Sequence, residues 1–387
     1  MISNHSGLRV RVLGGGLAGL SCSWFLQQSG RVRSLEVYDL NRPGFGGASS
    51  LAVLMHPFSP RGTVIWRGLE GCEATKSLLR LAAKHDRSGK KGCLYSTNRR
   101  LVRPLYSNQA LMDWGKTAAK FPQWFQLMSG AQYVEEFGVG TLQPLGSVCY
   151  TDATIVDAPR YLQGLWSAIQ DSSAHMSNAC EVRWIQFSSQ QDPTSLLDDC
   201  DALVVASGAG SNDLWRQLDS NGTTADLPFM YVRGQHLCFD ADGIEADTAA
   251  IVLSAEFPSY VLPVNGQLVC GATHEYGQLT DLISRPPSIK RADELLRQKL
   301  RILYPRLGGR NDGTPEPQAV SCAAAVRVST KRCHFGRLPV IGQHPMQSKA
   351  WLIAGFGSKG LVHHAVLGRA LAAAITHATP VPEDMRL

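Results

Sequence analysis

Three glycines near the N-terminus have the spacing that binds the pyrophosphate of a dinucleotide. Gly14, Gly16 and Gly19 follow a run of β-forming residues, 8–13, and open a helical stretch, 20–28. Gly14 permits a tight turn, Gly16 lets a phosphate approach the backbone, and Gly19 lets the helix pack closely on the strand. The N–H groups and the partial positive charge at the helix start favour a bound anion.

An acidic residue narrows the choice of dinucleotide. Asp39 lies twenty residues after Gly19, at the end of a second β-forming run, 35–38. Its carboxylate can accept a hydrogen bond from a ribose 2′-hydroxyl and would repel a 2′-phosphate, so FAD or NAD is preferred to NADP. The motif by itself does not separate FAD from NAD.

Three further turns rich in Gly and Ser favour FAD. They are GFGGASS (44–50), ASGAGS (206–211) and AGFGSKGL (354–361), and the last two follow apolar strands predicted at 202–206 and 351–354. A nicotinamide-dependent dehydrogenase would continue in uninterrupted βαβ units. Several turns after strands would instead hold a long ligand along its whole length, which predicts FAD.

Composition sets the general class of protein. The 387 residues are 44% hydrophobic and 18% charged, which is typical of a globular chain of two or three units. No apolar run approaches the roughly 20 residues of a membrane-spanning helix, and the polar residues 1–7 do not resemble a signal peptide. Ten cysteines without a Cys-x-x-Cys pair favour reduced thiols over disulfides or zinc. We therefore expect a cytoplasmic protein with no membrane partner and no metal.

The order of predicted elements indicates an interrupted α/β domain. Residues 64–83 have helical spacing, the β-forming runs gather after Leu227 (231–239, 250–254 and 260–273), and 361–375 form a last helix. A helix at 289–304 would begin at Ser288 and bury Leu295, Leu296, Leu300 and Leu303. We predict a Rossmann-like FAD-binding domain, discontinuous in sequence (1–75, 150–220 and 320–387), plus a β-sheet-based substrate domain (76–149 and 221–319).

One basic segment has two interpretations. Residues 86–104 are basic and polar, which predicts a loop with an edge strand. Arg99, Arg100 and Arg103, together with Tyr106, could form an RNA-facing patch. A solvated loop is the simpler interpretation, because runs of charge usually face water. The net charge of +6 is compatible with an anionic substrate or RNA and requires neither.

Together these residues resemble the D-amino-acid-oxidase-like FAD-dependent oxidoreductases, a family that includes glycine oxidase and sarcosine oxidase. The likeness covers most of the chain. Besides the glycine fingerprint with Asp39, it includes Gly47-Ala48-Ser49, Ala206-Ser207-Gly208, Gly271-Ala272-Thr273-His274-Glu275, Arg327-Val328-Ser329-Thr330, Pro339-Val340-Ile341-Gly342 and Gly357-Ser358-Lys359-Gly360-Leu361.

The resemblance implies a set of site residues. FAD, which we expect to be bound tightly but non-covalently, would contact Gly14, Gly16, Leu17, Ala18, Gly19, Asp39, Leu40, Gly47, Ala48, Ser49, Ala206, Ser207, Gly208, Gly355, Gly357, Ser358, Lys359, Gly360 and Leu361. Arg327 and Lys359 are the expected catalytic residues.

In such enzymes a substrate C–H bond beside an amine nitrogen is placed against the flavin, a hydride moves, and the imine hydrolyses. Arg327 would pair with a substrate carboxylate through two parallel hydrogen bonds. Lys359 and the N–H groups of 357–360 would face the flavin where reduction builds negative charge. The simpler alternatives are a structural ion pair for Arg327 and a solvated lysine at a helix start.

Within this family the closest likeness is to the FAD-dependent half of the bifunctional tRNA 5-methylaminomethyl-2-thiouridine biosynthesis protein. Met55-His56-Pro57 and Val232-Arg233-Gly234-Gln235 are similar to that branch, in which a carboxymethyl group is oxidatively removed from a modified uridine. The family resemblance implies that the substrate is an amino acid or N-substituted glycine-like amine, free or attached to tRNA, with oxygen as a possible acceptor. An NAD(P)-linked dehydrogenase and a non-catalytic flavoprotein that serves as an assembly partner are the other readings.

Overall fold

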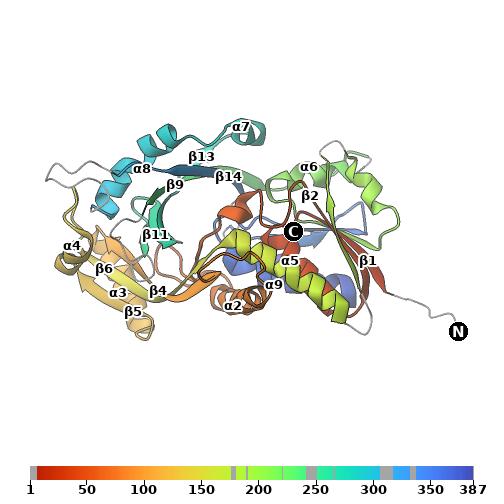
Figure 1. Cartoon of the computed structure of the whole chain (residues 1–387), viewed down its shortest axis with the longest axis horizontal. Helices are drawn as coiled ribbons and strands as arrows, with labels where there is room; N and C mark the ends of the chain where they lie inside the picture. The colour runs from red at the N-terminus through yellow and green to blue at the C-terminus, as the bar shows by residue number, and fades with distance from the viewer. Residues whose placement is uncertain are drawn as a thin grey trace.

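Two β-sheets organise the chain. The computed structural model describes residues 7–175, 180–188, 191–219, 221–240, 251–264, 266–305, 317–331 and 337–386. Within these ranges a six-stranded sheet has the order β15-β16-β8-β1-β2-β7, and a larger sheet has the order β13-β9-β12-β11-β10-β4-β6-β3, with β14 paired to β9 and β5 to β6. Figure 1 shows β1 and β2 toward one end of an elongated molecule and β4, β5 and β6 toward the other.

The six-stranded sheet is assembled from three distant parts of the sequence. Its strands are β1 (Leu8–Leu13), β2 (Val32–Asp39), β7 (Glu181–Gln186), β8 (Ala202–Val205), β15 (Val340–Gln343) and β16 (Ala350–Ala354). All neighbours pair in parallel except β15 and β16. The apolar runs that predicted strands at 8–13 and 202–206 are buried in this sheet because both of its faces are covered.

Four helices pack together beside this sheet. They are α1 (Leu17–Gln28), α2 (Gly68–Lys84), α5 (Ala158–His175) and α9 (Gly360–His377). Glycine allows two of their backbones to approach closely: a Cβ atom at Gly71 in α2 would lie 2.2 Å from the carbonyl oxygen of Val362 in α9. The same helix packing buries Leu79 and Tyr161 completely, so that α9 is held rigidly at its N-terminal end.

The larger sheet carries the remaining strands. They are β3 (Leu54–Met55), β4 (Tyr95–Leu105), β5 (Phe125–Ser129), β6 (Gly146–Val156), β9 (Phe229–Asp240), β10 (Ile251–Ser254), β11 (Ser259–Val264), β12 (Gln267–Gly271), β13 (Glu275–Tyr276) and β14 (Ser321–Thr330). Helices α3 (Asn108–Lys120), α4 (Gly130–Phe137), α7 (Leu279–Ser284) and α8 (Ile289–Leu303) pack around it, and α6 (Ser211–Gln217) follows β8. Short 3₁₀ turns occur at 48–51, 193–197, 208–210 and 383–385.

The predicted α/β class and discontinuous chain path are confirmed. Strands β9 to β12, within residues 229–240, 251–264 and 267–271, lie in the larger sheet, outside the parallel one. That sheet also contains all of β6 and β14, although the predicted limits assigned residues 150–156 and 321–330 to the FAD-binding domain. The domain limits themselves stay a prediction. The helix at 289–303 begins at Ser288 as expected, but Leu295 is 47% exposed because it lies on the outer face of α8.

The prediction for the basic segment was wrong. Residues 95–105 form β4, which pairs with β6 on one side and β10 on the other, so it is no edge strand. Arg99 and Arg103 are buried, and Arg100 forms an ion pair with Glu136. Successive side chains of a strand point to opposite faces, so a strand in the middle of a sheet can bury arginines that the charge of the segment alone predicts to be in solvent. The RNA-facing patch, the less favoured of the two interpretations, therefore lacks Arg99 and Arg103 at the surface.

Two general expectations can be compared with the described ranges. The nine cysteines that lie within them are all free thiols; the tenth, Cys333, falls outside. Among the helices of the described ranges, none combines the length and the hydropathy needed to span a membrane.

Candidate functional site

Three of the predicted glycine turns meet at one edge of the six-stranded sheet. The turns at 14–19, 206–211 and 355–360 follow β1, β8 and β16, which are adjacent and parallel. The carboxyl ends of parallel strands lie at the same edge, so the turns come together there. A Cβ atom on Gly14, whose φ is +107°, would lie 2.5 Å from the carbonyl oxygen of Ala206. The sheet thus forms a glycine-lined edge of the kind that binds dinucleotides.

The fourth predicted turn reaches the same edge from outside the sheet. The hydroxyl of Ser49 accepts a hydrogen bond of 3.1 Å from the backbone N–H of Leu17, in the first turn of α1. A Cβ atom on Gly16 would lie 2.7 Å from that hydroxyl oxygen. A serine hydroxyl and free N–H groups at a helix start fit a phosphate. These residues therefore fit the pyrophosphate of a dinucleotide.

Asp39 holds the loop around the first turn. One carboxylate oxygen accepts from the N–H of Gly15 at 2.7 Å and the other from the N–H of Asn41 at 2.8 Å. Burial raises the pKa of Asp39, and these backbone hydrogen bonds oppose the shift. A carboxylate has about four acceptor sites, so a ribose hydroxyl can be added to the two N–H groups. The indole of Trp184, which sequence analysis missed, packs on Gly15 and donates to the carbonyl of Asn41 at 3.1 Å.

Strand β14 connects the larger sheet to this edge. Ser329 forms an isolated bridge with Phe356, and the N–H of Gly357 donates to the carbonyl of Val328 at 2.8 Å. Arg327 precedes these contacts by one and two residues on the same strand. Arg327 therefore lies close in sequence to the contacts that join β14 to turn 355–360, the turn that contains Lys359.

Arg327 is partly buried and pairs with no carboxylate of the described residues. Strand β9 lies between β14 and β13. Its residue Val232 is paired with Arg327 of β14 on one side and with Tyr276 of β13 on the other. Burial lowers the pKa of Arg327, and the phenol groups of Tyr260 and Tyr276 partly oppose the shift. A Cβ atom on Gly234 would lie 3.5 Å from Nη2 of Arg327. Because Gly234 has no side chain, the guanidinium group of Arg327 has room beside it. Among the residues that the structure describes, no carboxylate serves this arginine as a counter-ion.

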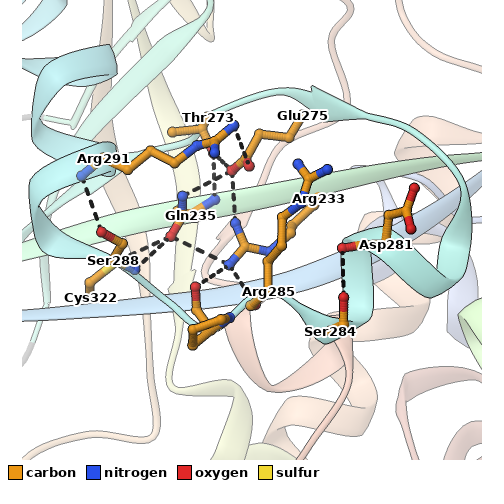
Figure 2. A network of polar contacts seen from close by, with 11 residues as sticks. Arg233, Gln235, Thr273, Glu275, Asp281, Ser284, Arg285, Ser288, Arg291 and Cys322 are labelled. Atoms are coloured by element: carbon orange, nitrogen blue, oxygen red, sulfur yellow. Dashed lines mark hydrogen bonds and ion pairs between the residues drawn. The ribbon is translucent and has the colours of Figure 1, made fainter.

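The nearest carboxylate on these strands is committed elsewhere. Glu275 accepts from Nη1 of Arg233 at 2.8 Å, from the side-chain amide of Gln235 at 2.9 Å and from the hydroxyl of Thr273 at 3.1 Å (Figure 2). Burial alone would raise the pKa of Glu275, but these hydrogen bonds and the positive charges of Arg233 and Arg291 lower it. Glu275 is therefore ionised. Oε1 accepts all three hydrogen bonds, whereas Oε2 has no hydrogen-bond partner and lies 3.5 Å from Nη2 of Arg291.

Strand alternation keeps this network away from Arg327. Glu275 pairs with Arg233, whereas Tyr276 and Arg327 both pair with Val232, one residue away. Neighbouring residues of a strand point to opposite faces. The guanidinium of Arg233 also donates to the carbonyl groups of residues 285 and 286 at 3.0 and 2.9 Å, which anchors the connection between α7 and α8.

Lys359 belongs to a second group of basic side chains. It precedes α9, and its Nζ lies 3.4 Å from Nε2 of His56. Burial and the charge of Arg103 lower the pKa of Lys359 to about 8, while the nearby thiol of Cys72 acts in the opposite direction. Burial, Lys359 and Arg103 hold the pKa of His56 well below its usual value, so this histidine is neutral.

Arg103 completes this basic group. It is 3% exposed, its Nε has no hydrogen-bond partner, and its guanidinium lies 5.0 Å from the centre of the Trp114 ring. Burial lowers its pKa to about 10, and the distant carboxylate of Glu256 opposes the shift. Glu256 itself accepts hydrogen bonds from the N–H of residue 106 and the hydroxyl of Ser107. Arg103 is thus a buried cation and Lys359 a partly buried one, and no carboxylate of the described residues is bound to either.

Sequence analysis identified part of this site. It named Lys359 and Arg327, but interpreted Arg103 as solvated and gave His56 no role. The burial of Arg103 could have been predicted from its apolar neighbours in Leu101-Val102-Arg103-Pro104-Leu105. Such a run is typical of a buried strand rather than of a loop.

The chain belongs to the family of FAD-dependent oxidoreductases. The family model described as "FAD dependent oxidoreductase" matches residues 9–374. The protein is accordingly an FAD-dependent enzyme that carries out oxidation–reduction chemistry. Among curated proteins, no sequence is similar enough to count as a match.

Several solved structures share the fold. Glycine oxidase from Geobacillus kaustophilus is 17% identical, with a TM-score of 0.71, covering 97% of this chain and 96% of that one. Iminodiacetate oxidase from Chelativorans sp. BNC1 is 17% identical, with a TM-score of 0.73 and 98% of each chain covered. L-proline dehydrogenase from P. horikoshii is 13% identical, with a TM-score of 0.69, covering 97% and 96%.

The first testable prediction concerns the ion pair of Arg233. Glu275→Ala leaves a guanidinium that is 2% exposed without its counter-ion, so we expect the free energy of unfolding to fall by about 3–5 kcal/mol. Urea denaturation measures this change. Glu136→Ala, which removes an exposed ion pair with Arg100, is the matched control and should cost less than about 1 kcal/mol. Equal losses for both variants would contradict the assigned role of Glu275.

The second prediction concerns the cofactor. Acid precipitation of the purified protein should release yellow FAD into the supernatant; flavin that stays in the pellet would show a covalent bond instead. Gly16→Leu should yield largely apoprotein, because its side chain would occupy the space beside Ser49. Gly115→Leu is the control, since a Cβ atom there meets nothing within 4 Å. The ratio of absorbance at 450 and 280 nm measures the FAD content of each variant.

Proposed function

We propose that the protein oxidises the C–N bond of an amino acid or N-substituted glycine-like amine. The single observation that supports this most is Arg327, which pairs with no carboxylate of the described residues and lies on the strand that bridges to the glycine-lined edge. A carboxylate entering such a site forms two parallel charge-assisted hydrogen bonds with a guanidinium group. The names of two structurally similar proteins, a glycine oxidase and an L-proline dehydrogenase, point to the same substrate class.

We assign the dinucleotide to the four turns at the sheet edge. Gly14, Gly16 and Gly19 with the start of α1 would hold the pyrophosphate, and Asp39 the adenosine ribose. Further contacts of FAD would come from Leu17, Ala18, Leu40, Gly47, Ala48, Ser49, Ala206, Ser207, Gly208, Gly355, Gly357, Ser358, Lys359, Gly360 and Leu361. When bound, FAD supplies the acceptor for a hydride.

The chain's own groups position the substrate and stabilise charge. Arg327 fixes the carboxylate end, which orients the carbon beside the nitrogen relative to turn 355–360. The backbone N–H groups at the start of α9 offer partial positive charge to the negative charge that reduction creates. Lys359, the residue before α9, would add a full positive charge beside these N–H groups. No nucleophilic side chain is needed for this chemistry.

Two other readings receive less support. A substrate attached to tRNA would need a basic surface, yet Arg99 and Arg103 of the expected patch are buried. A non-catalytic flavoprotein would gain nothing from Arg103, because a buried cation with no carboxylate partner among the described residues reduces stability. A free small-molecule amine is therefore our preferred substrate, with oxygen or another acceptor completing the cycle.

The test of this proposal is substitution of Arg327. Arg327→Met should keep FAD and the fold but lose about 30-fold or more in kcat/KM on carboxylate-bearing amines, because a buried charged partner contributes ~2–5 kcal/mol. Arg327→Lys should recover only part of the loss, since a lysine offers a point charge. The measurement is anaerobic bleaching of the flavin absorbance with glycine, sarcosine and proline.

An amine that lacks a carboxylate is the control substrate. Its reaction with Arg327→Met should match its reaction with the unaltered protein. If Arg327→Met keeps full activity on an oxidised carboxylate-bearing amine, Arg327 does not bind the carboxylate. If none of the amines bleaches the flavin, the proposed function is wrong.

A further inference from the structure

A buried chain of hydrogen bonds ends on the first peptide group of α9. The phenol oxygen of Tyr161, in the first turn of α5, lies 2.7 Å from Nε2 of His364. Nδ1 of the same histidine lies 2.9 Å from the carbonyl oxygen of Gly360, where α9 begins. Tyr161 and His364 are both 0% exposed, so bulk water does not compete for these hydrogen bonds.

The chemistry of the partners fixes the direction of this chain. A carbonyl oxygen only accepts, so Nδ1 of His364 carries a proton and donates it to Gly360. Burial lowers the pKa of His364 to about 4, although its hydrogen bond to the carbonyl of Gly360 acts in the opposite direction. The imidazole is therefore neutral at pH 7, and Nε2 has a free lone pair. Burial raises the pKa of Tyr161, so its phenol keeps the proton that it donates to Nε2.

The carbonyl of Gly360 and the N–H of Leu361 belong to one conjugated peptide group. A donor on the carbonyl oxygen draws electron density away from the nitrogen, which makes the N–H a stronger donor. Tyr161 adds to this effect, because a hydrogen bond to Nε2 makes the proton on Nδ1 more acidic. The two side chains therefore polarise the N–H of Leu361 without contacting it.

The N–H of Leu361 needs a partner from outside the protein backbone. It lies in the first turn of α9, where a helix leaves its N–H groups unused, and it donates to no backbone carbonyl of the described residues. Leu361 is only 3% exposed, so solvent is a poor substitute, and an N–H group buried without a partner is costly. A ligand at turn 355–360 would satisfy it.

We propose that Tyr161 and His364 are positioning residues for the flavin, which polarise the peptide group between Gly360 and Leu361 and so favour reduced over oxidised FAD. The inference rests on the proposed placement of FAD at turn 355–360 and on no particular substrate. Reduction builds negative charge on the flavin, and a stronger donor binds that charge more tightly. The chain thus raises the reduction potential of bound FAD.

Tyr161→Phe tests the chain with the smallest change in side-chain volume. The ratio of the affinities of the site for reduced and for oxidised FAD should fall about threefold, which is ~14 mV for a two-electron couple. His364→Phe removes the Nδ1 donor itself and should lower the ratio about tenfold, or ~30 mV. Equilibration of the FAD-bound protein with a redox dye of known potential measures both changes.

Ser21→Ala is the matched control. Ser21 is also 0% exposed, and its hydroxyl donates to the carbonyl oxygen of Ala18 at 3.0 Å or of His364 at 2.9 Å. Its loss weakens the packing of α1 on α9 beside the same histidine but leaves the peptide group of 360 and 361 alone. This variant should be less stable to urea, as Tyr161→Phe should, yet change the affinity ratio by less than about 1.5-fold.

Sulfite gives a second readout that needs no reductant. It adds to oxidised flavin and leaves negative charge on the ring, so its affinity depends on the same N–H donor. Its dissociation constant, measured by the loss of absorbance at 450 nm, should rise about threefold in Tyr161→Phe and stay within about 1.5-fold in Ser21→Ala. Neither comparison requires that His364→Phe folds.

The outcomes separate this inference from the proposed function. If Tyr161→Phe keeps the reduction potential and the sulfite affinity of the unaltered protein, the chain is structural only and the inference is wrong. If Ser21→Ala lowers both as much as Tyr161→Phe does, loosened helix packing explains the change and the inference is also wrong. Failure of every amine to bleach the flavin would overturn the proposed function alone, because neither readout uses an amine.

Discussion

The ion pair between Arg233 and Glu275 determines which cations of the larger sheet are left for a ligand. Because both partners are almost fully buried, neither can be separated without a large cost. Alternation along β9 and β13 then directs this pair to one face and Arg327 to the other. A shift of one residue in the register would bring Glu275 to the face of Arg327 and neutralise it. The availability of Arg327 is therefore a consequence of strand pairing.

The six-stranded sheet supplies the second constraint. Its parallel strands β16, β8 and β1 end at a common edge, which collects turns from residues 14, 206 and 355 onward. Neither sheet holds a complete site. In the proposed site, three of the four FAD turns belong to the six-stranded sheet and Arg327 and Arg103 to the larger one, and β14 joins the two sheets through the contact of Ser329 with Phe356. The proposed catalytic geometry thus depends on packing between the two sheets.

The features of the site that depend on a few neighbouring residues could be predicted from the sequence. The glycine fingerprint, Asp39 and the turns after apolar strands were all readable, because each depends on a few neighbouring residues. Arg103 was not, because its burial depends on β4 pairing with both β6 and β10, which lie far away in the chain. Likewise, no sequence pattern indicates that Glu275 faces away from Arg327; that follows from the register between distant strands. The limits of the two domains stay a prediction for the same reason.

The most direct test of the account is a crystal structure of the FAD-bound protein with methylthioacetate, a carboxylate that cannot be oxidised as an amine. The account predicts that its carboxylate accepts two hydrogen bonds from the guanidinium of Arg327, with its sulfur atom beside the flavin. A carboxylate bound elsewhere, or Arg327 paired with a carboxylate of the protein itself, would contradict it.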